Sequence, residues 1–249
     1  MRPDIYFTYT TGALWALALT LYGVRIALRG VFQSERVSKI GGSVMVGRGI
    51  MDATYWAIDP VVRGLAALGI TPNILTWSAL VLGLGAGAAL AVGWFGLATL
   101  LATMSTIGDI LDGQVARLTN TGSSRGELLD AAIDRYTEFA FLAGLVLFFR
   151  ESWWQMSLAL GATLASYMVS YASAKAEALQ VNPPRGVMRR HERAMYLITG
   201  VGLVPLVGPT LAAHDLPYMT TCLVALAIVA VFGNLAAVLR FVRIGRALG

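Results

Sequence analysis

The sequence predicts an all-α protein, a polytopic bundle of helices that crosses a membrane several times. Hydrophobic residues make up 57% of the chain and charged residues only 13%, whereas about a quarter of the residues in a soluble domain are charged. Many apolar stretches approach the roughly 20 residues that a helix needs to span a bilayer. These stretches do not alternate apolar and polar residues, which excludes a membrane β-barrel.

Residues 10–28 form the first apolar segment, which we interpret as a retained membrane helix with its N-terminus outside. A signal peptide carries its positive charge before the apolar run, but in this chain the stronger basic flank begins at Arg25 and follows the run. We therefore assign residues 1–49 to an extra N-terminal transmembrane helix and a cytoplasmic linker, and residues 50–249 to the main domain. Residues 50–68 mix charged, aromatic and apolar side chains, a pattern that suits an amphipathic helix at the membrane interface.

A series of membrane helices is expected after this interfacial segment. Thr71 and Pro72 form a helix start, with proline at the first helical position. A tight turn at residues 93–96 and a break at Pro183 and Pro184 separate later segments. The expected helices cover residues 72–92, 97–118, 126–149, 153–179, 194–213 and 218–240.

The basic residues are distributed very unequally between the two sides of the predicted bundle. Of the 19 Lys and Arg residues, all but Arg2 and Arg150 fall on one side. By the positive-inside rule that side is cytoplasmic. The net charge of +5 is then explained by topology and by contacts with anionic lipid, and it does not indicate nucleic acid. We expect a protein of the cell (inner) membrane.

Four aspartates lie in one stretch, residues 109–134, on the predicted cytoplasmic side. Asp109 and Asp112 are three residues apart and Asp130 and Asp134 are four apart, so each pair shares one face of a helix. Clustered carboxylates beside apolar runs are costly unless cations accompany them. Ligand sets made only of oxygen atoms suit hard divalent ions, Mg²⁺ or Mn²⁺ before Zn²⁺. The alternative is a carboxylate cluster used for helix packing or proton relay.

The aspartates belong to a longer pattern of eight fixed positions. It reads Asp109-x2-Asp112-Gly113-x2-Ala116-Arg117-x8-Gly126-x3-Asp130-x3-Asp134. This pattern resembles the signature of the CDP-alcohol phosphotransferases, integral membrane enzymes of phospholipid synthesis. The resemblance implies a six-helix core within residues 50–249, a homodimer, and a CDP-linked lipid donor, usually CDP-diacylglycerol. An acceptor hydroxyl would attack the lipid-side phosphorus, and CMP would leave.

The resemblance also implies roles for individual residues. Asp109, Asp112 and Asp130 would be the principal metal ligands. Asp134 would be the general base, which needs to lie within hydrogen-bond reach of the hydroxyl, and would also touch the metal site. Two Mg²⁺ ions, with Mn²⁺ as the alternative metal, would clamp the pyrophosphate. The nucleotide site would be lined by Asp109, Asp112, Gly113, Ala116, Arg117, Gly126 and Asn73, with Asp59 as a further candidate.

Polar and cationic residues that follow the aspartates predict a binding site for the acceptor. They are Tyr171, Lys175, Arg185, Arg189, Arg190 and Arg193. Such a cluster suits an anionic acceptor such as inositol phosphate or glycerol phosphate. Residues 170–177 and 191–193 are similar to the phosphatidylinositol-phosphate synthase branch of the family, although Ser173 and Lys175 stand where those enzymes typically carry a lysine and an arginine. We favour inositol phosphate on this basis.

Several alternatives stay open at this point. The acceptor could be glycerol phosphate, serine or an amino alcohol, and the arginines could simply mark a cytoplasmic loop. A transporter would show internal repeats and helices broken at the membrane midplane, and we find no repeat. An inactive membrane scaffold would be expected to lack at least one aspartate of the pattern, and this chain keeps all four.

Overall fold

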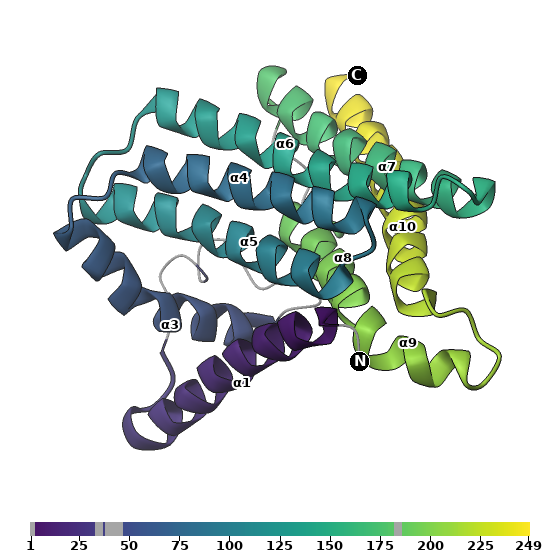
Figure 1. Cartoon of the computed structure of the whole chain (residues 1–249). Helices are drawn as coiled ribbons and strands as arrows, with labels where there is room; N and C mark the ends of the chain where they lie inside the picture. The colour runs from purple at the N-terminus through teal and green to yellow at the C-terminus, as the bar shows by residue number, and fades with distance from the viewer. Residues whose placement is uncertain (1–2, 33–36, 38–46, 182–185) are drawn as a thin grey trace.

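The computed structural model describes residues 3–32, 37, 47–181 and 186–249. All regular structure in this described part is helical, which confirms the all-α prediction (Figure 1). The helices are α1 (Asp4–Arg29), α3 (Gly47–Ala67), α4 (Pro72–Ala91), α5 (Phe95–Leu118), α6 (Ser124–Phe148), α7 (Trp153–Ala178), α8 (Arg190–Gly202), α9 (Val204–Ala212) and α10 (Thr220–Leu248).

Helices α4, α5 and α6 run side by side and carry the aspartate pattern (Figure 1). Glycines allow α4 and α6 to approach closely, because a side chain at Gly87 would collide with the backbone of Ala140 and one at Gly144 would collide with the Gly87 carbonyl. A Cβ at Gly83 would lie only 2.6 Å from Thr137 Cγ2. Small residues at such positions are what membrane helices use for tight packing. The close contact fixes α6, and with it two of the aspartates, against α4.

The second half of the bundle is formed by α7, α8 and α10. Ala159, Ala162 and Ala165 of α7 are fully buried, and a Cβ at Gly233 of α10 would lie 2.8 Å from Ala165 Cβ. The main apolar core joins these helices to α4, α5 and α6 through residues such as Leu226. Helix α8 contacts α5, α7 and α10. Its first turn therefore faces the helices that carry the aspartates.

The straight helix expected over residues 194–213 is instead two helices. Helix α8 begins earlier, at Arg190, and the chain bends by 52° where α9 begins. Pro205 lies in the first turn of α9. Because proline has no N–H and its ring collides with the preceding turn, α8 cannot continue through this position. The last helix is longer than expected, since α10 continues to Leu248.

The structure identifies the protein as an integral membrane protein. In the described part, α1, α4, α5 and α10 are long and apolar enough to cross a membrane, and α8 with α9 makes up to five if the bent pair is one span. The predicted six-helix core with an extra span is therefore not confirmed in number. Helix α6 opens with several charged residues, which lowers its apolar character.

Helix α1 confirms a long helix at the start of the chain and docks on the bundle at both ends. Near its start, the Asp4 carboxylate accepts hydrogen bonds from the backbone N–H groups of Gly96 and Leu97, both at 3.0 Å. Near its end, the rings of Tyr22 and Trp56 have centroids 5.7 Å apart. The assignment of residues 1–49 and 50–249 to separate units stays a prediction.

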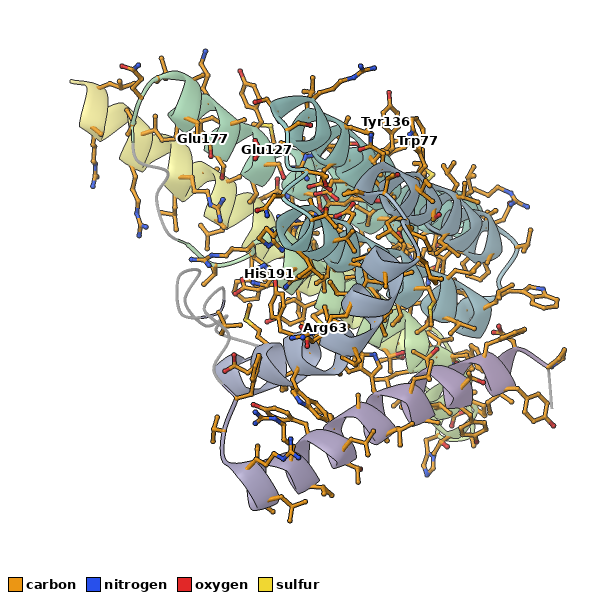
Figure 2. All side chains as sticks on the ribbon, turned by 90° about the vertical axis from the view of Figure 1, so that its left-hand side faces the viewer. Arg63, Trp77, Glu127, Tyr136, Glu177 and His191 are labelled. Carbon is orange, nitrogen blue, oxygen red and sulfur yellow. The ribbon has the colours of Figure 1, made fainter. Side chains whose placement is uncertain are left out.

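Helix α3 lies across the end of the bundle where α4 begins and α5 ends (Figure 1). Ile58 and Val62 pack against Leu111 and Val115 of α5. Figure 2 looks at this end of the bundle, with Glu127 in the first turn of α6 labelled. The position of α3 at a membrane interface stays a prediction, but its contact with α5 places it next to the aspartates.

Candidate active site

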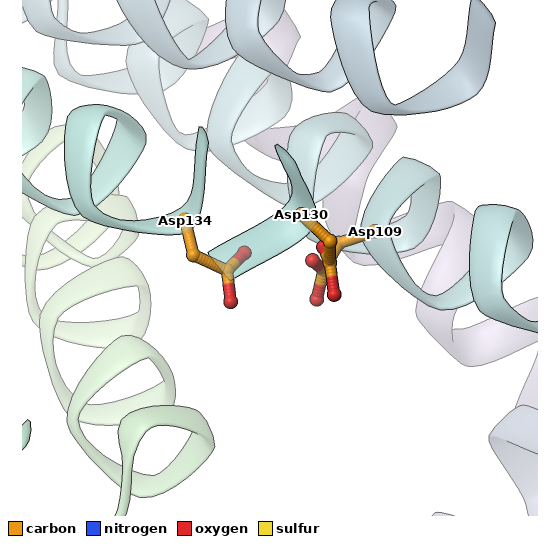
Figure 3. Close-up of side chains that lie close together, drawn as sticks. All are labelled: Asp109, Asp130 and Asp134. Atoms are coloured by element: carbon orange, nitrogen blue, oxygen red, sulfur yellow. The ribbon is translucent and has the colours of Figure 1, made fainter. Parts of the chain in front are cut away.

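Three aspartates meet between α5 and α6. One carboxylate oxygen from each of Asp109, Asp130 and Asp134 lies within 4.8 Å of the other two, as Figure 3 shows. Asp130 and Asp134 lie on successive turns of α6, so their side chains point the same way. The start of α6 is set by Ser123, whose side-chain oxygen accepts a hydrogen bond of 3.1 Å from the Gly126 N–H. This cap fixes where α6 begins, ahead of both aspartates.

Asp112 has different surroundings from the other three aspartates. It is 5% exposed, and its carboxylate accepts a hydrogen bond of 2.6 Å from Thr76 Oγ1 on α4. It lies outside the three-membered group, and its role as a metal ligand stays a prediction. The sequence analysis missed Thr76, although it lies three residues after Asn73 on the same helix and therefore on the same face.

A pocket of about 920 Å³ opens next to the aspartates. Apart from the further candidate Asp59, the residues predicted for the nucleotide site line it, namely Asn73, Asp109, Asp112, Gly113, Ala116, Arg117 and Gly126. The polar loop between α5 and α6 and Tyr55 of α3 also line it. Gly113 leaves room for a neighbour, since a Cβ there would lie 3.4 Å from the Arg117 guanidinium nitrogens. The volume is within the usual range for small-molecule sites.

Arg190, at the start of α8, is inserted among the aspartates. Its Nη1 lies 3.1 Å from Asp109 Oδ2, and its Nη2 forms an ion pair with Asp134 Oδ1. The Arg190 side chain is 34% exposed and lines the pocket. Among the predicted acceptor residues that the structure describes, Arg190 alone does so. The single positive charge of Arg190 thus offsets part of the negative charge of two clustered carboxylates.

The comparison with known proteins explains this arrangement. The sequence model of the CDP-alcohol phosphatidyltransferase family matches residues 69–245. The chain belongs to this family. The resemblance seen in the aspartate pattern is therefore confirmed. Apart from Tyr55, the residues that line the pocket lie within the matched region of this phosphatidyltransferase.

Similar proteins are phosphatidylinositol phosphate synthases of Mycobacterium, Cutibacterium and Corynebacterium species. That of Mycobacterium tuberculosis (strain ATCC 25618 / H37Rv) is 31% identical over 158 residues, which cover 58% of this chain and 68% of the relative. That of Cutibacterium acnes is 28% identical over 199 residues, covering 76% and 91%. The crystal structure of the M. tuberculosis enzyme with CDP-DAG bound covers 74% of this chain and 92% of its own, with 24% identity and a TM-score of 0.64. This likeness shows a shared fold.

The aspartate cluster of the phosphatidyltransferase fits a divalent metal ion. Its three carboxylates supply only oxygen atoms, the donor set that hard cations prefer. Asp130 Oδ1 is buried and has no hydrogen-bond partner among the described residues. An unpaired buried carboxylate oxygen is costly, and a metal ligand bond would satisfy it. No His or Cys of the described residues belongs to the group, which disfavours zinc.

Arg193 does not lie where its predicted role in acceptor binding requires. Its side chain is fully buried and donates hydrogen bonds to Glu138 Oε1, at 3.0 and 2.7 Å, and to Ser166 Oγ at 3.1 Å. It also donates to the Met188 carbonyl at 2.7 Å. The physical reason is depth, because Arg193 lies one helical turn further into the bundle than Arg190. Glu138 correspondingly binds a neighbouring helix and is not part of the metal group.

The remaining predicted acceptor residues that the structure describes do not line the pocket. Tyr171 is exposed and packs on Phe241, with ring centroids 6.1 Å apart, and Lys175 is exposed on the same helix. Arg189 caps α8, and Arg185 lies outside the described residues. The structure therefore does not gather the predicted acceptor set around the aspartates. Roles for these residues in acceptor binding stay predictions.

Two further outcomes concern residues that sequence reasoning misjudged. Asp59 does not line the pocket, because it pairs with Arg63 at 2.9 Å on an exposed face of α3. Arg240 appeared in the sequence only as a topology signal. It is buried and donates to Ser173 Oγ at 2.9 Å and to the Val187 carbonyl at 3.1 Å. No sequence signal could have found this contact, since it depends on how α10 packs against α7.

Proposed function

We propose that this phosphatidyltransferase moves the phosphatidyl group of CDP-diacylglycerol to the hydroxyl of a phosphorylated polyol, with inositol phosphate favoured, and releases CMP. The observation that carries the proposal is the pocket in which the clustered aspartates and Arg190 face one another. The proposal is supported by the relatives named phosphatidylinositol phosphate synthase and by the structural neighbour with CDP-DAG bound.

The nucleotide end of the donor would lie along the C-terminal half of α5. Gly113 and Ala116 line the pocket with little side-chain bulk, which leaves space for a ligand beside the backbone. Arg117 lines the same wall and carries a guanidinium, the group best suited to bind phosphate through two hydrogen bonds. Gly126 faces this wall from the start of α6.

Asp109, Asp130 and Asp134 would hold Mg²⁺, with Asp112 as a further ligand and two ions in the complete site. When bound, the metal would supply charge stabilisation to the pyrophosphate and to the leaving CMP. Arg190 offsets only part of the mutual repulsion of these aspartates, so net negative charge would favour a bound cation there.

Asp134 would act as the general base. It would take the proton of the acceptor hydroxyl as that oxygen bonds to the lipid-side phosphorus and the bond to CMP breaks. Such a base must lie about 2.6–3.2 Å from the hydroxyl. Arg190 contacts Asp134, so an acceptor whose phosphate binds Arg190 would bring its hydroxyl to this carboxylate.

We also propose that the pocket faces the cytoplasm of the inner membrane, on the basis of the positive-inside rule. The cytidine nucleotide and the phosphorylated acceptor are both polar and cytoplasmic, which agrees with this orientation. A homodimer is proposed from family membership. Residues 50–249 would form the catalytic domain, with α1 as an addition.

The test is CMP release by the purified full-length protein with CDP-diacylglycerol and Mg²⁺. The acceptor panel would contain inositol phosphate, glycerol phosphate, serine, free inositol and ethanolamine. We expect release with inositol phosphate and none with free inositol. Equal CMP release with serine or free inositol would overturn the proposal that the acceptor is phosphorylated.

Two variants control this experiment. Asp130→Asn should abolish release. Asp59→Asn removes the same charge outside the pocket and should leave release unchanged. Folded protein that neither releases CMP nor binds CDP nucleotides would overturn the enzymatic proposal in favour of a membrane scaffold.

A further inference from the structure

Arg190 contacts two of the three carboxylates that would bind the proposed metal. Its two terminal nitrogens contact Asp109 Oδ2 and Asp134 Oδ1, and both carboxylates belong to the group whose oxygens lie within 4.8 Å of one another. A guanidinium stays protonated and offers only donors. Arg190 and a divalent ion are both cations that bind the same two carboxylates. We therefore expect them to compete, and their mutual repulsion favours movement of the Arg190 side chain when a metal binds.

The backbone around Arg190 is held in place, so the movement falls to its side chain. Arg193 donates to the Met188 carbonyl at 2.7 Å, and Arg240 donates to the neighbouring Val187 carbonyl at 3.1 Å. Two buried arginines thus fix the two residues that precede the first turn of α8. In a guanidinium on a flexible stem, a change of partner needs only rotation of side-chain bonds.

Space for such a rotation exists on two sides. Arg190 lines the large pocket and also a separate cavity of about 70 Å³ behind it. The cavity is lined mostly by apolar residues, among them Phe141 and Leu197, and also by Ser105, Thr137 and Glu138. The Arg190 side chain therefore lies between the pocket proposed for the substrates and this smaller cavity.

We propose that Arg190 exchanges partners during the reaction cycle. Without metal it is the counter-ion of Asp109 and Asp134. Once a divalent ion takes these carboxylates, the guanidinium turns to the phosphate of the acceptor. This inference rests on the proposed function. It predicts that metal and acceptor bind cooperatively, and thermodynamic linkage makes the effect reciprocal.

The first experiment is a calorimetric titration of the metal-free, full-length protein with Mn²⁺. Arg190→Gln should bind Mn²⁺ about fivefold or more tightly than the wild type, the lower range of coupling between sites, because no cation has to leave. Arg125→Gln is the matched control. It removes one arginine from the start of α6, outside the residues that line the pocket, and its Mn²⁺ affinity should stay unchanged.

Arg190→Lys keeps the inference testable should the glutamine variant fail to fold. Lysine carries the charge as a single point and cannot bridge two carboxylates as a guanidinium does. Its Mn²⁺ affinity should lie between those of the wild type and Arg190→Gln. Unchanged or weaker Mn²⁺ binding in a folded Arg190 variant would overturn the exchange.

The second experiment measures the affinity for inositol phosphate with and without Mn²⁺. Mn²⁺ should raise that affinity in the wild type, and most of this gain should disappear in Arg190→Gln. Equal gains in both proteins would overturn the exchange. If the wild type binds no Mn²⁺ at all, the proposed metal site itself is wrong, which distinguishes failure of the proposed function from failure of this inference.

Discussion

Two arginine–carboxylate pairs lie one helical turn apart between α6 and α8, and they differ mainly in depth. Arg190 with Asp134 faces the pocket, where the arginine is 34% exposed. Arg193 with Glu138 is buried, with the arginine at 0% and the glutamate at 11% exposure. We call them the pocket pair and the buried pair.

The two pairs have the same composition, an arginine and a carboxylate, but different depths give them different roles. The pocket pair keeps access to solvent and ligands, so its partners can change. In the buried pair the donors of Arg193 are completed by Ser166 and by the Met188 carbonyl, and breaking a buried ion pair is costly. Chemistry can therefore use Asp134 and Arg190, while Arg193 and Glu138 hold the helices that position them.

The largest expected effect is on the pocket pair. Asp134→Asn should lower CMP release by about 10²–10⁴-fold, the usual contribution of a general base. Donor binding should be largely kept, because the residues of α5 that we propose for the nucleotide, Gly113, Ala116 and Arg117, are unchanged. Turnover and binding of CDP-diacylglycerol would both be measured. Retained turnover would remove Asp134 as the base and leave the pocket pair without a catalytic member.

The next effect concerns the buried pair. Arg193→Met should lower the free energy of unfolding by up to about 3–5 kcal/mol, the cost of breaking a buried pair, because it leaves Glu138 with only the longer 3.6 Å contact to Arg135. The double variant Arg193→Met with Glu138→Leu should regain most of this loss, since an apolar pair of similar size is often neutral. The measurement is denaturant unfolding in detergent.

The outcome that would contradict the comparison is a stable Arg193→Met protein with a raised KM for the acceptor. Arg193 would then belong to the binding site after all, as the sequence first predicted. A parallel measurement of KM for inositol phosphate therefore accompanies the unfolding experiment.

A smaller effect is expected at the hydrogen bond between α4 and α5. Thr76→Val keeps the shape of the side chain but removes the donor to Asp112, and an unsatisfied buried acceptor costs about 1–3 kcal/mol. Ser78→Ala is the matched control, since Ser78 bonds only to the Ile74 carbonyl on an exposed turn of α4. Thermal unfolding of both variants would be compared. Equal losses would show that the Asp112 contact adds nothing beyond an ordinary helix-surface bond.

The sequence predicted which residues of α5 and α6 line the pocket more completely than it predicted where the arginines lie, for a physical reason. Gly113, Ala116 and Gly126 have positions that depend on helix periodicity and on one short loop, which are local properties. The places of Arg190 and Arg193 depend on where α8 begins and on the bend before Pro205. These are tertiary outcomes, and a cluster of arginines carries no sign of which member is buried. Asp112 shows the same limit, because its bond to Thr76 requires the packing of α4 against α5.

The smallest expected effect lies at the other end of α5, where α1 docks. Asp4→Ala removes the acceptor of two backbone N–H groups in the first turn of α5, and loss of such a cap costs about 0.5–2 kcal/mol. Gly96 and Asp109 are 13 residues apart in one helix, or roughly 20 Å at the helical rise per residue. Turnover should therefore stay unchanged, and Asp4→Asn, which keeps one acceptor oxygen, should lose less stability than Asp4→Ala. A fall in turnover without a fall in melting temperature would show instead that α1 acts on the pocket through α5, so that the extra helix would be part of the catalytic unit.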